Sequence, residues 1–490
     1  MEQGIRRVGI VVVVLLVALV GQLTWLQVVD AKTLANNGNN PRKIFADFNS
    51  ARGNILSADG KVLARSVDVK DEFGKQREYP LGDLVSQVVG YQSVTVGSTG
   101  LERTYNDVLL GRRHPHIGLQ DVVDFFKGTK HVGNLVTSLR VDAQLQAKAA
   151  LGSQKGSVVV IEPSTGKIVA LYSNPSFDPT PLASHDPKTV QQHFALINSQ
   201  AAGNTALPRA YREIYPPGST FKVVTTTAAI DANPAVLTQT FDRLTQLPIP
   251  QAPNNPIANF GHHTCGGTLE QSFVSSCNTT FALLGLQLGN AFPPAMSRFG
   301  IYSAPPLDIA PGAATSQGPA PGTFDTAKPR FALAGIGQGD VATTPLQMAL
   351  VASGIANGGV IKTPHVGVTI LDDAGKIVAT LPDRTWKRAT SAATAAQVRD
   401  FMIQVVNSPN GTGTAARIAG VTVAGKTGTA QTVGTQAPHA WFVAFAPAEA
   451  PRYAVAVIVE HGGNAQNEAT GGKVAAPIAR QVLEFLLNHT

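Results

Sequence analysis

Apolar residues form a nearly unbroken stretch from Val8 to Val29. This stretch is about as long as a helix that crosses a bilayer. Arg6 and Arg7 come just before it and favour a cytoplasmic N-terminus. A cleaved signal peptide would have a shorter apolar region followed by a small-x-small cleavage site, and none stands out after Val20. The pattern therefore predicts an uncleaved single-pass anchor within residues 1–30, with the rest of the chain outside the membrane.

Beyond the anchor, shorter apolar runs predict two domains. Residues 31–154 show mixed short strands and loops, whereas residues 155–490 alternate between longer helical and strand-like runs. We expect the second domain to be an α+β fold, a central antiparallel sheet with helices on both sides. The expected helices are 221–230, 390–406 and 475–487, the expected strands are 421–425, 441–446 and 453–460, and the Pro-, Ala- and Gly-rich segment 303–330 is expected to be a loop near the cleft.

Composition narrows the possible functions only slightly. Of the 490 residues, 43% are hydrophobic and 14% are charged, below the usual charged fraction of about 25%. This favours a globular chain over a disordered one. The net charge of +7 is mild for this length, and no dense basic stripe with interleaved aromatic residues is present, which argues against a nucleic-acid partner.

The two cysteines, Cys265 and Cys277, leave two interpretations open. Outside the membrane they could form a disulfide, but a cysteine at position 277 could equally be a small buried side chain. His262 and His263 lie close to Cys265, yet this group lacks a second ligand pair at zinc-like spacing. We therefore expect no metal and no cofactor, and we expect residues 262–265 to form a polar loop near the cleft.

The most informative motif is Ser219-Thr220-Phe221-Lys222, which follows Tyr215-Pro216-Pro217-Gly218. A serine hydroxyl is a weak nucleophile near neutral pH and needs an adjacent base. The prolines and glycine predict a turn, and the apolar run after it predicts a helix with Ser219 at its N-terminus. Lys222, three residues on, then lies on the same face. Burial and a second cation would lower its pKa enough for it to act as the base.

Two further motifs follow in order. Ser276-Cys277-Asn278 lies between apolar runs that predict two helices joined by a turn. Ser276 could relay a proton to a leaving group, and Asn278 could bond a substrate amide. Alone, this motif is equally consistent with an ordinary helix N-cap at Ser276 or Asn278.

Lys426-Thr427-Gly428-Thr429 follows a strand-like segment and predicts an edge strand that lines a cleft. Lys426 and Thr427 could donate to a substrate carboxylate, and Lys426 would be the second cation near Lys222. Gly428 would let the backbone approach a ligand closely. The N–H groups of Ser219 and Thr429 are the candidates for an oxyanion hole. The ordered set of three motifs predicts an acyl-transfer site with a serine nucleophile and no histidine.

These motifs make the chain resemble the class B penicillin-binding proteins. Its short N-terminal domain and its Ala- and Val-rich composition most resemble the penicillin-binding protein A group of actinobacteria. The resemblance extends over nearly everything after the membrane segment. It also rests on Arg52-Gly53-Asn54-Ile55, on Thr99-Gly100-Leu101-Glu102-Arg103-Thr104-Tyr105-Asn106, on residues 156–170 and 174–179, and on Gly337-Gln338-Gly339 with residues 344–349.

The resemblance implies a D,D-transpeptidase that cross-links peptidoglycan stem peptides ending in acyl-D-Ala-D-Ala. It implies an acyl-enzyme on Ser219, an acceptor amine from a second stem peptide, and acylation by β-lactam antibiotics. Residues 31–154 would form a non-catalytic, dimerisation-like or pedestal domain, and residues 155–490 the transpeptidase domain. Expected partners are the cytoplasmic membrane, a glycan polymerase and cell-wall assembly proteins.

Three alternative functions differ from a transpeptidase in their expected sequence features or in their reactivity. A β-lactamase of class A type would carry an E-x-x-L-N element between Asn278 and Lys426, and none is present. A D,D-carboxypeptidase on the same fold would differ in how its acyl-enzyme reacts. A covalent β-lactam sensor should carry several membrane spans or a cytoplasmic effector domain, whereas only about seven residues precede the apolar stretch.

Overall fold

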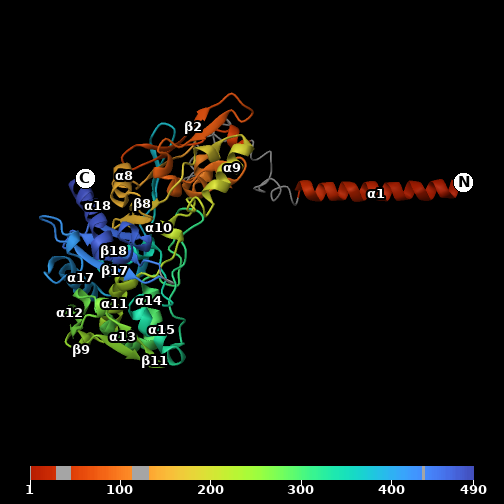
Figure 1. Cartoon of the computed structure of the whole chain (residues 1–490). Helices are drawn as coiled ribbons and strands as arrows, with labels where there is room; N and C mark the ends of the chain where they lie inside the picture. Colours follow the sequence, from red (N-terminus) through yellow and green to blue (C-terminus); the bar gives the residue numbers. More distant parts are fainter. Residues whose placement is uncertain (1, 29–45, 113–131, 433–435, 490) are drawn as a thin grey trace. The chain divides into compact units, whose positions relative to one another are not determined.

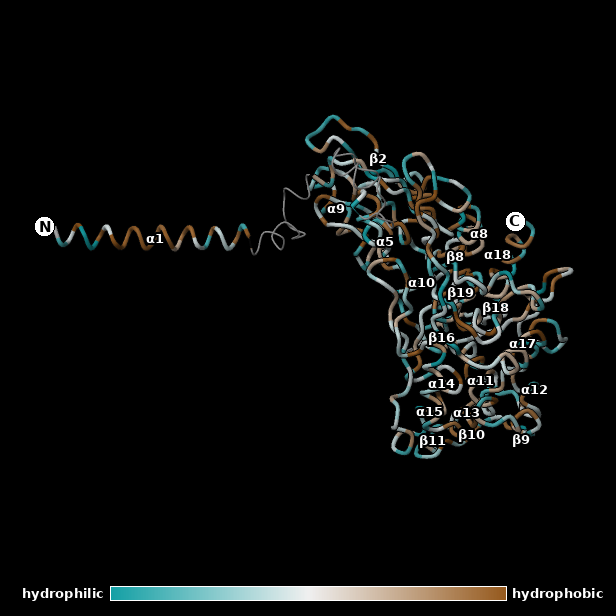
Figure 2. Tube along the Cα trace, turned by 180° about the vertical axis from the view of Figure 1, so that it is seen from behind, coloured by the Kyte–Doolittle hydropathy of each residue, from teal (hydrophilic) through white to brown (hydrophobic). Residues whose placement is uncertain are grey.

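The computed structural model describes residues 2–28, 46–112, 132–432 and 436–489. The chain divides into two units, one formed by residues 1–51 and 66–76 and the other by residues 52–65 and 77–490. The first unit contains helix α1 (Glu2–Val28). Among the described residues, the segment Gln3–Val28 is the one helix long and apolar enough to cross a membrane, with a mean hydropathy of 2.5. Figure 2 shows its predominantly hydrophobic colouring.

The second unit contains a five-stranded antiparallel sheet, in the order β17 (Ala424–Ala430), β18 (His439–Ala446), β19 (Tyr453–Val459), β7 (Gly156–Ile161) and β8 (Ile168–Asn174). Every residue of β18, β19 and β7 is buried, so both faces of the sheet are covered. The strand β17 lies at one edge. It pairs in register with β18, with Lys426 opposite Val443 and Gly428 opposite Trp441.

Helices cover this sheet. Two of them, α8 (Val141–Leu151) and α18 (Ala476–Asn488), pack against each other and against the sheet. The helix α16 (Pro345–Ala356) packs on β7, β18 and β19, and also on α11 (Lys222–Ala232) and α17 (Ala392–Asn407). Residues 345–355 of α16 are all buried, as expected for a helix that is apolar all round.

A group of helices lies beside the sheet and carries two of the three motifs (Figure 1). It consists of α11, α12 (Leu269–Val274), α13 (Asn278–Leu288), α14 (Phe292–Arg298) and α15 (Lys328–Gly335). Helices α13 and α15 touch where Gly285 of α13 faces Gly335 of α15. A Cβ at Gly285 would lie 2.2 Å from the carbonyl oxygen of Phe331.

A second, six-stranded sheet has the order β15 (Ile377–Thr380), β14 (Gly367–Leu371), β6 (Asn134–Thr137), β1 (Ile55–Leu56), β2 (Val62–Asp68) and β3 (Lys75–Glu78). The strands β14 and β6 pair antiparallel. Segments on both sides of residue 154 therefore share one sheet, and the boundary expected there remains a prediction.

Short elements complete the described residues. The remaining strands pair two by two. They are β4 (Gln92–Ser93) with β5 (Gly97–Ser98), β9 (Thr240–Leu244) with β12 (Cys265–Thr268), β10 (Gln246–Ile249) with β11 (Ala252–Ala258), and β13 (Val360–Lys362) with β16 (Thr385–Arg388). The remaining α-helices among the described residues are α4 (Ser86–Val89), α5 (Gly100–Thr104), α6 (Asn106–Leu109), α9 (Pro187–Ile197) and α10 (Arg209–Arg212).

The α+β fold with a central antiparallel sheet is confirmed, with two local corrections. The segment 303–330 was expected to be a loop throughout, but α15 already begins at Lys328, with Pro329 in its first turn. The strand expected at 421–425 instead begins at Ala424 and runs through the Lys426-Thr427-Gly428 motif. Pairing with β18 along the whole of β17 accounts for this shift.

Two motifs of the N-terminal half meet in a buried ion-pair cluster. Glu102 accepts hydrogen bonds from Nε and Nη2 of Arg52, at 2.8 and 2.6 Å, and from Nε of Arg77 at 2.6 Å. All three side chains are buried. Burial by itself would raise the pKa of Glu102, but the guanidinium groups of Arg77 and Arg52 hold that pKa below its usual value.

We predict that Glu102→Gln lowers the free energy of unfolding by about 3–5 kcal/mol, because two buried guanidinium groups lose their counter-charge. The matched control is Glu78→Gln, which removes the partner of Arg65 in a partly exposed pair at 3.0 Å. That change should cost at most about 1 kcal/mol. Chemical denaturation of the purified chain measures both, and equal losses in the two variants would contradict the role given to the buried cluster.

Candidate functional site

Ser219 lies in a 3₁₀ turn, η3 (Gly218–Phe221), and α11 begins directly after it at Lys222. The sequence predicted Ser219 at a helix N-terminus, and the structure places it one 3₁₀ turn ahead of the α-helix. Side chains at i and i+3 of such a turn lie above each other, so Ser219 and Lys222 project to the same side. Ser219 is half-buried, whereas Lys222 is fully buried.

Contacts from two neighbouring segments fix the turn that carries Ser219. The N–H of Gly218 donates to the carbonyl oxygen of Gly337 at 2.9 Å. The indole Nε1 of Trp441 donates to the carbonyl oxygen of Pro216 at 3.0 Å. Gly337 belongs to the Gly-Gln-Gly segment that supported the resemblance. A Cβ at Gly337 would lie 2.1 Å from the carbonyl oxygen of Gly218, so this position requires a glycine.

The strand β17 packs directly on the same turn. A Cβ at Gly428 would lie 2.8 Å from the carbonyl oxygen of Pro217, and one at Gly218 would lie 2.7 Å from that of Thr429. Gly428 was expected to admit a ligand, and the structure gives it a packing reason, since it lets β17 approach the turn. The backbones of Ser219 and Thr429, which carry the two candidate oxyanion N–H groups, therefore belong to segments in contact.

The Ser276-Cys277-Asn278 turn joins α12 and α13, as the sequence predicted. Cys277 is the N-cap residue of α13 and makes no side-chain capping bond, so the plain N-cap interpretation of this motif does not apply to Ser276 or Asn278. Ser276 adopts φ 58°, which is an uncommon conformation for a residue with a side chain. This conformation directs its carbonyl oxygen and its hydroxyl toward two lysines.

Lys222 donates from Nζ to the carbonyl oxygen of Ser276 at 2.7 Å and to Oδ1 of Asn278 at 2.8 Å. Its Nζ also lies 3.4 Å from Oγ of Ser276 and 5.2 Å from the ring centre of Phe281. Burial first, and the charge of Lys426 second, lower the pKa of Lys222 well below the usual lysine value. A neutral lysine amine in this position can accept a proton from a neighbouring hydroxyl.

Lys426 donates from Nζ to Oγ of Ser276 at 2.9 Å and to the carbonyl oxygen of Thr427 at 3.2 Å. It is also fully buried, and burial lowers its pKa to about 7. Ser276 therefore connects the two buried lysines, since both amines reach its hydroxyl. The three motifs that the sequence predicted to converge do so at this residue.

Sequence reasoning missed part of the wall of the site. The hydroxyls of Thr412 and Thr427 lie 2.8 Å apart, which holds the Thr427 side chain in place. Gly471 and Gly472 follow β19 and pack against these residues, since a Cβ at Gly471 would lie 2.5 Å from the carbonyl oxygen of Gly428 and one at Gly472 would lie 2.3 Å from that of Thr412. The only sequence signals for these positions were the stretch Gly411-Thr412-Gly413-Thr414 and the pair Gly471-Gly472.

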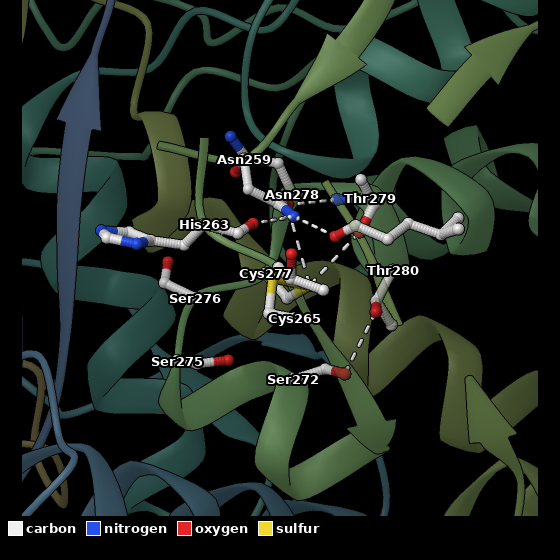
Figure 3. The surroundings of a disulfide bond; sticks show 12 residues. Asn259, His263, Cys265, Ser272, Ser275, Ser276, Cys277, Asn278, Thr279 and Thr280 are labelled. Atoms are coloured by element: carbon white, nitrogen blue, oxygen red, sulfur yellow. Dashed lines mark hydrogen bonds between the residues drawn. A yellow bond between two sulfur atoms is a disulfide. The ribbon is translucent and has the colours of Figure 1, made fainter. Parts of the chain in front are cut away.

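A loop between β11 and β12 lies against the Ser276 turn (Figure 3). Cys265 and Cys277 form a disulfide, which decides between the two interpretations that the sequence left open. His262 and His263 are exposed in this loop, as expected for a polar segment. Because Cys265 is already bonded to Cys277, it is not available as a metal ligand, and no cluster of three or more His, Cys, Asp or Glu side chains suited to a metal occurs in the described part of the chain.

Two family profiles match the chain. The penicillin binding protein transpeptidase domain matches residues 156–484, and the penicillin binding protein A dimerisation domain matches residues 52–136. Among curated relatives, peptidoglycan D,D-transpeptidase PbpA of Mycolicibacterium smegmatis is 38% identical, with 100% of both chains covered. PbpA of Mycobacterium tuberculosis is 37% identical, with 99% of both chains covered.

Solved structures of penicillin-binding protein A from M. tuberculosis are similar throughout. Its ceftriaxone acyl-enzyme complex has a TM-score of 0.80 and 36% identity, over 90% of this chain and 99% of that one. Its penicillin G acyl-enzyme complex has a TM-score of 0.78 and 37% identity, over 89% of this chain and 100% of that one.

We predict a bell-shaped pH profile for acylation by penicillin G. The rate should rise as Lys222 loses its proton, because only the neutral amine can act as a base, and it should fall above about pH 7 as Lys426 loses the charge that faces an anionic ligand. Stopped-flow acylation between pH 4 and 10 measures both limbs. A rate that climbs steadily to pH 10 would indicate a lysine with an ordinary pKa and would reject this assignment.

Proposed function

The chain belongs to the class B penicillin-binding proteins and is a peptidoglycan D,D-transpeptidase that β-lactams acylate, and we propose that Ser219 is the residue that carries the acyl group. One observation supports this most. Lys222 and Lys426, both buried, converge on Ser276, and Lys222 directly follows the turn of Ser219. No histidine takes part in this set of contacts.

In the first step, Oγ of Ser219 attacks the carbonyl carbon of the D-Ala-D-Ala amide, or of a β-lactam ring. Neutral Lys222 takes the proton of the attacking hydroxyl, as its lowered pKa allows. The amide carbonyl oxygen becomes an oxyanion. The N–H groups of Ser219 and Thr429 donate to it, because their segments meet at Gly218.

The tetrahedral intermediate collapses when the leaving nitrogen receives a proton. Ser276 supplies this proton from its hydroxyl and regains one from Lys222, whose Nζ lies 3.4 Å from its Oγ. Lys222 thereby returns to its neutral form, while Lys426, whose Nζ lies 2.9 Å from the same Oγ, keeps its charge. D-Ala leaves as the amine product, or the β-lactam ring opens. The acyl-enzyme remains until an acceptor amine attacks the ester, with Lys222 again as the base.

Asn278 has two roles in this scheme. Its Oδ1 accepts from Lys222, and its Nδ2 donates to the carbonyl oxygen of Ala258 at 3.0 Å. It therefore orients the base from within the protein. The Nδ2 group has two N–H bonds, and the second would serve the contact with a substrate amide that the sequence suggested.

The substrate carboxylate would bind to Lys426 and Thr427. Lys426 carries a positive charge in part at neutral pH, because its pKa is about 7. Thr412 holds the hydroxyl of Thr427 at the site through their 2.8 Å contact. A carboxylate near Lys426 would stabilise the charged ammonium, so binding and protonation support each other.

We also propose a single-pass anchor in the cytoplasmic membrane with the catalytic domain outside it. The length and hydropathy of α1 support the anchor, and the basic residues Arg6 and Arg7 support a cytoplasmic N-terminus. The disulfide supports an oxidising compartment for the catalytic domain. A separate glycan polymerase and cell-wall assembly proteins are the proposed partners, because the two matched profiles describe dimerisation and transpeptidation.

We predict that penicillin adds one acyl group to the chain and that Ser219→Ala abolishes the adduct. Lys222→Arg keeps the positive charge but cannot deprotonate, so acylation should slow by about a hundredfold or more while the fold survives. Intact mass spectrometry with peptide mapping measures the adduct, and circular dichroism reports the fold. An adduct on Ser219→Ala, or near-normal acylation of Lys222→Arg, would reject the respective role.

We further predict that the acyl-enzyme favours transfer over hydrolysis. No E-x-x-L-N element lies between Asn278 and Lys426 to activate a water molecule, so a β-lactam adduct should persist for many minutes. With a thioester donor and a stem-peptide amine, the transferred product should exceed the hydrolysed one. Product quantification by chromatography decides this. Rapid β-lactam turnover would favour a β-lactamase, and hydrolysis without transfer would favour a carboxypeptidase.

A further inference from the structure

The backbone of Ser276 adopts an unfavourable conformation that the site needs. With φ 58° it presents its carbonyl oxygen to Lys222 and its hydroxyl to Lys426. Non-glycine residues keep such conformations only when the surrounding structure enforces them. Something next to Ser276 must therefore hold this turn in place.

The neighbouring residue supplies a covalent restraint. Cys277 is buried, and its sulfur is bonded to Cys265 at the start of β12. The strand β12 pairs with β9, and Cys265 lies opposite Leu244. The disulfide thus ties the residue after Ser276 to a small two-stranded sheet that carries none of the three motifs.

Asn259 makes a parallel, non-covalent link between the same segments (Figure 3). Its Oδ1 accepts from the N–H of Thr279 at 3.0 Å, and its Nδ2 donates to the carbonyl oxygens of Leu244 at 2.7 Å and His263 at 2.9 Å. Asn259 is buried. It keeps the loop against α13 but binds to the C-terminal side of the turn, whereas the disulfide acts one residue from Ser276.

We propose that the Cys265–Cys277 disulfide is a positioning element for acylation, which holds Ser276 against the two lysines, so that its reduction slows acylation without unfolding the domain. This rests on the proposed function of Ser219, Lys222 and Ser276. Two thiols cannot occupy the space of a bonded sulfur pair, so the sulfurs must separate on reduction. Cys277 is buried on the α13 side, and the displacement is passed to the Ser276 backbone next to it.

The domain should survive this change for two reasons. The cysteines are separated by only 12 positions, and the stabilisation that a disulfide gives by loop closure grows with the length of the loop. Asn259 also keeps its hydrogen bonds to both segments when the disulfide is open. Reduction should therefore alter the local geometry of the turn more than the global fold.

The test uses the full-length chain in detergent, with and without dithiothreitol. The disulfide takes up two electrons and two protons from the reagent and becomes two thiols, while the reagent closes to its cyclic disulfide. Cys265 and Cys277 are the only cysteines in the sequence, so the reagent has one target. Stopped-flow kinetics with a fluorescent penicillin separate the acylation rate constant from the initial dissociation constant.

We expect the acylation rate constant to fall at least tenfold on reduction, with a change of less than threefold in the dissociation constant. Reoxidation should restore the rate. The double variant Cys265→Ala/Cys277→Ala should show the slow rate under both conditions and no response to dithiothreitol. Circular dichroism melting should show that the reduced chain remains folded under the assay conditions.

An unchanged acylation rate in the reduced chain and in the double variant would overturn the proposal. So would a loss of rate that coincides with melting of the domain, because the disulfide would then act on overall stability alone. Failure of the proposed function has a different signature, since the oxidised chain would then fail to be acylated at Ser219 before any reduction.

Discussion

Two lysine amines are buried around a single serine hydroxyl, and the rest of the catalytic domain serves to keep them there. Two buried ammonium groups cannot both remain charged at low cost, because burial and mutual repulsion each disfavour the charged form. Burial lowers the pKa of both Lys222 and Lys426, and the charge of Lys426 lowers the pKa of Lys222 further. In the proposed mechanism, deprotonation of one amine provides a base, and the other remains available as a cation for an anionic ligand. In this mechanism, burial gives the two lysines different roles.

Close backbone packing fixes the relative positions of the segments that carry the motif residues. The turn of Ser219, the edge strand β17 and the Gly337 segment approach so closely that side chains at Gly218, Gly428 and Gly337 would collide with neighbouring carbonyl groups. The indole of Trp441 fixes the same turn from β18. The motif residues are thus held by rigid elements of the sheet and of α11, which suits a site where small displacements are costly.

The Ser276 turn is held in a different way. It lies outside the sheet, between two helices, and its conformation is unfavourable for a residue with a side chain. A disulfide and a buried asparagine connect it to the loop before β12. The same loop carries the exposed side chains of His262 and His263. Lys222 and Lys426 therefore depend on two kinds of support. One is the rigid packing of the sheet and the Ser219 turn, and the other is the Ser276 turn, which local cross-links hold in position.

The sequence by itself determined the chemistry, because the three motifs are short and each carries its reactive groups within four residues, where local geometry fixes their spacing. It also determined the α+β class, the membrane-length helix and the main helices and strands, which follow from local hydrophobic periodicity. Only the tertiary structure decided what depends on distant segments meeting. Examples are the convergence of Lys222 and Lys426 on Ser276, the Thr412–Thr427 contact, the packing role of Gly428, and the pairing of Cys265 with Cys277. Periodicity describes which face of an element is apolar, but it does not say which other element covers that face.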